Sequence, residues 1–91
     1  MKKRFQIVVS GKVQGVFFRA FTQKKAKSLG LNGFVMNRPD GTVYIDTQGE
    51  EETLNQLVAW CWDGSPLSSV THVEVTQTPN LLEADDFIIK R

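Results

Sequence analysis

Apolar residues recur along the chain with two different periods, and each change of period marks a predicted element. Phe5, Ile7 and Val9 alternate with less apolar neighbours over 5–10, which is the period of a strand with one face in a core. The other predicted strands cover residues 31–37, 42–47, 69–78 and 87–89, and predicted helices cover 18–29 and 50–62.

Both predicted helices have an apolar face. The face of the first consists of Phe18, Thr22, Ala26 and Leu29, and that of the second of Leu54, Leu57, Val58 and Cys61. Gly30 follows the first helix, as a glycine commonly does at a helix C-terminus. Residues 50–52 are all glutamate, which suits the positive N-terminal end of the second helix.

The predicted order is strand, helix, strand, strand, helix, strand, followed by a short terminal strand. Two such split units usually fold as a ferredoxin-like α/β sandwich. We therefore predict one α+β domain over 1–91, with an antiparallel sheet and both helices on one face. Residues 38–41, Arg-Pro-Asp-Gly, are typical of a turn, which makes a hairpin with Asn37 near its tip.

Composition narrows the class of protein. The chain has 91 residues and a net charge of +1, so no overall field attracts nucleic acid or an anionic membrane, and an anion must be recognised locally. Cys61 is the only cysteine, which rules out an intrachain disulfide. We find no secretory signal and no apolar run of membrane length, and we expect a monomer in the cytoplasm.

The connection between the first strand and the first helix has the residues of an anion site. Gly11 and Gly15 lie four residues apart, and glycine permits conformations that turn several N–H groups toward one point. Arg19 follows at the helix start, with donors that match phosphate oxygens. The spacing alone also fits a tight connection with a surface arginine. The segment matches neither a Walker A loop nor the dinucleotide-binding motif G-x-G-x-x-G, and this disfavours a nucleotide site.

Two longer motifs resemble the signatures of the acylphosphatase family. Residues 11–19 read G-K-V-Q-G-V-F-F-R, and residues 33–49 read G-F-V-M-N-R-P-D-G-T-V-Y-I-D-T-Q-G. The resemblance implies a ferredoxin-like enzyme that hydrolyses acyl phosphates to a carboxylate and inorganic phosphate. It also implies that Arg19 holds the phosphate and that Asn37 orients the attacking water. The implied phosphate cradle is the backbone of Val13, Gln14, Gly15, Val16, Phe17 and Phe18.

The implied reaction needs few catalytic groups. A carboxylate leaving group, whose conjugate acid has a pKa near ~4, departs without a general acid. Positioning and charge stabilisation can then supply most of the catalysis. Nothing in the sequence resembles a metal-binding cluster of His, Cys and carboxylates. We expect hydrolysis of a small-molecule acyl phosphate without metal or cofactor, and no nucleic-acid or membrane partner.

Several residues also have a plain structural interpretation. Asn37 fits a turn, Cys61 fits a helix core, and His72 fits an exposed or edge position on its strand. Arg38 departs from the family pattern and would place a second cation near the anion. The whole chain could instead be a non-catalytic ferredoxin-like anion-binding or regulatory module. An RNA-binding domain of similar topology is disfavoured, because its aromatic strand motif is missing.

Overall fold

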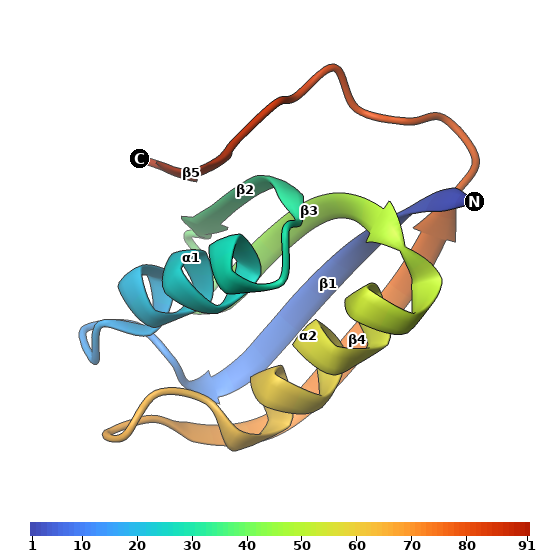
Figure 1. Cartoon of the computed structure of the whole chain (residues 1–91). Helices are drawn as coiled ribbons and strands as arrows, with labels where there is room; N and C mark the ends of the chain where they lie inside the picture. Colours follow the sequence, from blue (N-terminus) through green and yellow to red (C-terminus); the bar gives the residue numbers. More distant parts are fainter.

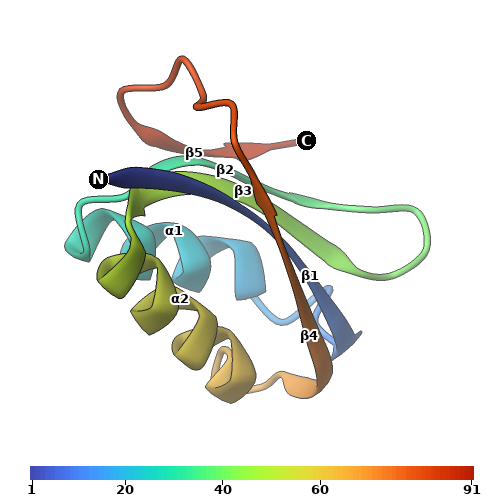
Figure 2. The ribbon, with the colours of Figure 1, turned by 90° about the vertical axis from the view of Figure 1, so that its right-hand side faces the viewer.

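The computed structural model describes residues 1–91 and contains a five-stranded sheet with two helices on one face (Figure 1). The strands are β1 (Lys2–Lys12), β2 (Asn32–Asn37), β3 (Val43–Glu50), β4 (Ser69–Thr78) and β5 (Phe87–Lys90), and the helices are α1 (Phe18–Ser28) and α2 (Glu51–Asp63). Figure 2 shows both helices on the same side of the sheet. The predicted α+β ferredoxin-like sandwich is confirmed. Neither helix has the length and apolar character that a membrane span requires.

The sheet is mixed, whereas the sequence predicted an antiparallel one. The strand order is β4-β1-β3-β2-β5, and only β2 and β5 run parallel. Thr78 at the end of β4 pairs with Arg4, and Arg4 pairs with Gln48. Gln48 in turn pairs with Asn32, the first residue of β2. β4 therefore ends at the same end of the sheet at which β2 begins. Residues 79–86 cross at this end to the opposite edge of the sheet (Figure 2), so β5 runs in the same direction as β2.

Two predicted strands continue beyond the apolar alternation that marked them. The first was predicted over 5–10 and the third over 42–47, yet the two strands pair without interruption from Lys2 with Glu50 to Val9 with Val43. Main-chain pairing therefore extends both strands. α2 follows β3 directly, because Glu50 ends the strand and also serves as the helix N-cap.

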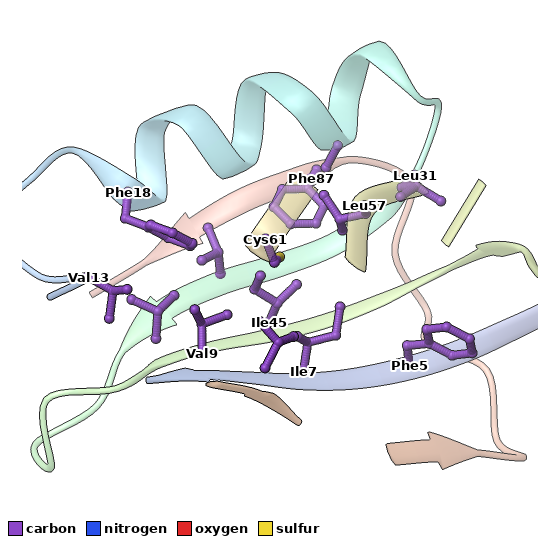
Figure 3. Packing of buried hydrophobic residues seen from close by; sticks show 14 of the residues in the cluster. Phe5, Ile7, Val9, Val13, Phe18, Leu31, Ile45, Leu57, Cys61 and Phe87 are labelled. Carbon is purple, nitrogen blue, oxygen red and sulfur yellow. The ribbon is translucent and has the colours of Figure 1, made fainter. Parts of the chain in front are cut away.

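The core lies between the sheet and the helices (Figure 3). Phe5, Ile7 and Val9 are buried, as their alternation predicted. The buried helix residues are Phe18, Thr22, Ala26, Leu54, Leu57 and Cys61. Leu29 and Val58, which were predicted on the same faces, are half-buried and pack against this core. Each fully buried large apolar side chain contributes about 1.5–3 kcal/mol, so these faces hold the helices on the sheet.

Gly30 ends α1 as predicted. It adopts a φ of 72°, which glycine reaches without strain. Its N–H donates to the carbonyl of Lys27 at 3.0 Å, and the N–H of Leu31 donates to the carbonyl of Ala26 at 3.0 Å. This pair of bonds is a Schellman motif, and it satisfies carbonyls that the helix end would leave free.

Candidate active site

The segment between β1 and α1 presents a row of free backbone amides. No N–H group from Val13 to Ala20 donates a hydrogen bond to an acceptor of the protein. Val13 to Phe17 lie outside the sheet, and the amides of residues 18–20 belong to the first turn of α1, where no preceding carbonyl can accept. A row of donors at a helix N-terminus is suited to binding an anion.

Two residues with positive φ shape this segment. Gly15 has a φ of 75° and Phe17, the N-cap of α1, a φ of 60°. Left-handed residues in a short segment help turn successive amides toward one side, which makes a concave anion site. Glycine adopts this conformation freely, whereas in Phe17 it costs about 1–2 kcal/mol. The Phe17 side chain is 72% exposed, so burial of its ring does not offset this strain.

Buried side chains anchor the segment. Val13 and Val16 are only 1% and 5% exposed and belong to the core cluster. The Ser65 hydroxyl, also buried, donates to the carbonyl of Val16 at 3.0 Å. These contacts hold the Val13 and Val16 side chains and the Val16 carbonyl in place, which anchors the main chain while its amides stay unpaired.

Gln14 connects the amide segment to the hairpin between β2 and β3. Its Nε2 donates to the carbonyl of Arg38 at 2.8 Å and to the carbonyl of Thr42 at 3.0 Å. The Gln14 side chain therefore links two segments that are more than twenty residues apart in the chain. It fixes the position of the hairpin relative to the amides.

Arg19 and Asn37, the predicted catalytic residues, line the same pocket of about 280 Å³. The other residues that line it are Val13, Gly15, Phe17, Phe18, Ala20, Ile89 and Arg91. Arg19 is the second residue of α1 and is half-buried. It takes part in none of the salt bridges or side-chain hydrogen bonds of the protein, so its guanidinium donors are free for a ligand.

Asn37 is placed differently from the hairpin tip that the sequence predicted. It is the last residue of β2, it pairs with Val43, and the turn itself lies beyond it. The side chain is half-buried. Its Oδ1 is the one buried side-chain oxygen or nitrogen without a hydrogen-bond partner. Leaving such an acceptor unpaired costs about 1–3 kcal/mol, a cost that a hydrogen bond from a molecule in the pocket would remove.

The expectation that Arg38 adds a second cation beside the anion is wrong. Its guanidinium lies over the ring of Tyr44, 5.5 Å from the ring centroid, and it does not line the pocket of Arg19 and Asn37. Arg38 follows the alternation of β2, which directs Val35 into the core and Met36 to the other face of the sheet. Consequently Asn37 faces the helix side and Arg38 the open side.

Sequence reasoning missed Ile89 and Arg91, which also line the pocket. They reach it because β5 pairs in parallel with β2, with Val35 opposite Ile89 and Met36 opposite Lys90. The next position in this register brings Arg91 level with Asn37. The apolar alternation of Phe87 and Ile89 was a usable signal for the strand, but nothing local in the sequence indicates its partner.

Cys61 and His72 have the structural roles predicted for them. Cys61 is fully buried, and burial raises the pKa of its thiol to about 12, which keeps it protonated and unreactive. His72 is exposed on the edge strand β4, and its ring meets that of Trp62 at a centroid distance of 6.1 Å. Neither lines the pocket. No three His, Cys, Asp or Glu side chains are grouped so that they could hold a metal ion.

This chain belongs to a family with several known members in sequence and structure. The chain matches the family described as Acylphosphatase over residues 5–89. An acylphosphatase of Shewanella amazonensis is 45% identical over 87 residues, which cover 96% of this chain and 91% of that protein. The crystal structure of acylphosphatase from Bacillus subtilis aligns over 100% of both chains with a TM-score of 0.95 and 41% identity. An acylphosphatase structure from Coxiella burnetii, 36% identical, aligns with a TM-score of 0.93 over 98% of this chain and 93% of that one.

Proposed function

This chain belongs to the acylphosphatase family and hydrolyses acyl phosphates, and we propose that Arg19 and the amides of Val13 to Phe18 hold the phosphoryl group while Asn37 orients the attacking water. One observation carries this assignment of roles. Arg19 and Asn37 come from different parts of the chain and line one pocket, together with Val13, Gly15, Phe17 and Phe18 of the amide segment. The amides of this segment, the guanidinium and the Asn37 Oδ1 have no hydrogen-bond partner in the protein.

The phosphoryl group is negatively charged, and its oxygens need several donors at once. The free amides of the segment and the positive end of α1 supply partial charge, and Arg19 supplies a full positive charge with forked donors. In phosphoryl transfer the transition state spreads charge over the equatorial oxygens, so the same groups that bind the substrate stabilise the transition state.

Asn37 acts on the water. Its Oδ1 accepts a hydrogen bond from a water molecule, which turns a lone pair of the water oxygen toward phosphorus. The new bond forms between the water oxygen and phosphorus, while the bond from phosphorus to the acyl oxygen breaks and the attacking water releases one proton to a phosphate oxygen or to solvent. The electron pair leaves with the carboxylate, which is stable as an anion at neutral pH because its conjugate acid has a pKa near ~4. No general acid is required.

We also propose that the chain works as a single monomeric domain in the cytoplasm, releases inorganic phosphate, and uses no nucleic-acid or membrane partner. The net charge of +1 supports only the absence of nucleic-acid and membrane partners, because attraction to polyanions requires a larger positive field. Light scattering on the purified protein tests the oligomeric state, and a mass of two chains would contradict it.

Hydrolysis of benzoyl phosphate, measured with a chelator present, tests the proposed roles. The parent protein should turn over, Arg19→Gln and Asn37→Ala should each lose at least about a hundredfold in turnover, and His72→Ala should keep it. A parent protein that binds phosphate without turnover would instead support the non-catalytic module. Activity that requires an added divalent ion would show that the mechanism lacks a component.

A further inference from the structure

Ser65 reaches the amide segment from a distant part of the chain. It lies in the loop between α2 and β4 and is only 2% exposed. Its hydroxyl donates to the carbonyl of Val16 at 3.0 Å. The main chain of Ser65 is held in turn, because its carbonyl accepts from the N–H of Ser68 at 3.0 Å and from the Ser68 hydroxyl at 2.7 Å. The donor to Val16 is therefore both buried and fixed in position.

The carbonyl of Val16 and the N–H of Phe17 belong to one peptide group. No peptide bond of the chain is cis, so these two groups point in opposite directions across a planar trans unit. The buried Ser65 hydroxyl lies on the carbonyl side, which directs the Phe17 N–H away from Ser65. Phe17 lines the pocket of Arg19 and Asn37, and its N–H has no acceptor in the protein. The hydrogen bond from Ser65 thus sets the direction of one amide of the proposed phosphate cradle.

The conformation of Phe17 favours rotation of this peptide group. Its φ of 60° is left-handed, which brings a Cβ close to a carbonyl oxygen. Its side chain is 72% exposed, so packing of the ring does not hold this conformation. A half-turn of the peptide group would bring φ of Phe17 to a negative value, which residues with a Cβ adopt readily. The same half-turn would point the Val16 carbonyl oxygen toward the anion, and it would break the hydrogen bond from Ser65.

We propose that Ser65 is a positioning residue that locks the peptide group between Val16 and Phe17 with its N–H toward the phosphoryl group. This rests on the proposed function, because it takes the Phe17 amide to be part of the phosphate cradle. Without the Ser65 hydroxyl, the peptide group populates both orientations, and one of them turns an oxygen toward the anion. Phosphate binding and transition-state stabilisation both weaken, since the same amide serves both.

NMR spectra of the amide groups, recorded with and without saturating inorganic phosphate, test the direction of this N–H. In the parent protein, phosphate should move the Phe17 amide proton downfield, as a charge-assisted hydrogen bond does. Ser65→Ala should lose most of this shift, whereas the Gly15 amide, which Ser65 does not hold, should keep its own response. The Kd of phosphate should rise about tenfold, and kcat/KM for benzoyl phosphate should fall by a similar factor.

Ser68→Ala is the matched control. Its hydroxyl belongs to the same loop but donates to the Ser65 carbonyl, which keeps the Ser68 N–H as a donor. This variant should keep the Phe17 shift, and a loss equal to that of Ser65→Ala would show that loosening of the loop is the cause. Ser65→Cys nearly keeps the side-chain shape with a weaker donor, so it should lose part of the shift, and it decides the question if Ser65→Ala does not fold.

Two substitutions of Phe17 test the strain. Phe17→Ala and Phe17→Gly both remove the ring, but only glycine adopts the φ of 60° without strain. Ser65→Ala should therefore raise the Kd of phosphate less when combined with Phe17→Gly than when combined with Phe17→Ala. Equal effects in the two combinations, or an unchanged Phe17 shift in Ser65→Ala, would overturn the positioning role while the parent protein still binds phosphate. A parent protein that neither binds phosphate nor hydrolyses benzoyl phosphate would refute the proposed function instead.

Discussion

Replacing Asn37 by alanine should separate catalysis from stability. Asn37 Oδ1 is buried without a hydrogen-bond donor in the protein, and such an acceptor costs about 1–3 kcal/mol of folding free energy. Alanine removes the acceptor, together with the modest packing of a half-buried side chain. We expect the free energy of unfolding to stay level or to rise by up to about 1 kcal/mol, because the two effects partly cancel.

The thermal midpoint should therefore stay level or rise while turnover falls. In a domain of this size, 1 kcal/mol corresponds to roughly 4–8 °C in Tm. Turnover of benzoyl phosphate should fall about a hundredfold or more, since the water loses the group that positions it. Calorimetry and an initial-rate assay on the same preparation measure both quantities.

Asn32→Ala provides a matched control. Asn32 lies at the other end of β2, outside the pocket, and its main-chain carbonyl, which accepts from Thr47 Oγ1, is unaffected by the substitution. Its turnover should match that of the parent protein. Normal turnover in Asn37→Ala, or a fall in Tm of more than about 4 °C, would refute the reasoning.

Three further predictions concern other groups. Inorganic phosphate at 100 times its Kd should stabilise the parent protein by about 2.7 kcal/mol and raise Tm by about 10 °C or more relative to matched sodium chloride. Arg19→Gln should lose most of this shift and Asn37→Ala should keep it; survival in Arg19→Gln would contradict the phosphate-holding role. Gln14→Leu should lower turnover at least tenfold while the protein stays folded, because the hairpin is no longer linked to the amides, and unchanged kinetics would argue against that link. Burial raises the pKa of the Cys61 thiol from 9.0 to about 12, so its contribution to stability should be complete below pH 9 and decline between pH 9 and 12, where the unfolded thiol ionises first. Urea unfolding of Cys61→Ala should show a shallower decline over this range, and an identical decline would show that other groups cause it.

Local patterns predicted most of the elements and pointed to the candidate site. The alternation of Phe5, Ile7 and Val9 is enough to place one face of β1 in a core, because side chains of a strand alternate wherever the strand lies. Glycines and Arg19 at a helix start similarly indicate an anion site, since the free amides of a helix N-terminus are a local property. The two family motifs named Arg19 and Asn37, and the structure brings them to one pocket.

Tertiary structure alone decided which distant segments meet there. The parallel pairing of β5 with β2 depends on where β4 ends in space, and only this pairing brings Arg91 and Ile89 to the pocket. Likewise, Asn37 and Arg38 are neighbours in sequence, but the alternation at the end of β2 directs them to opposite faces of the sheet. The periodicity of a sequence predicts which face of a strand or helix is apolar. Which segment packs beside that strand or helix depends on how the strands pair across the whole sheet.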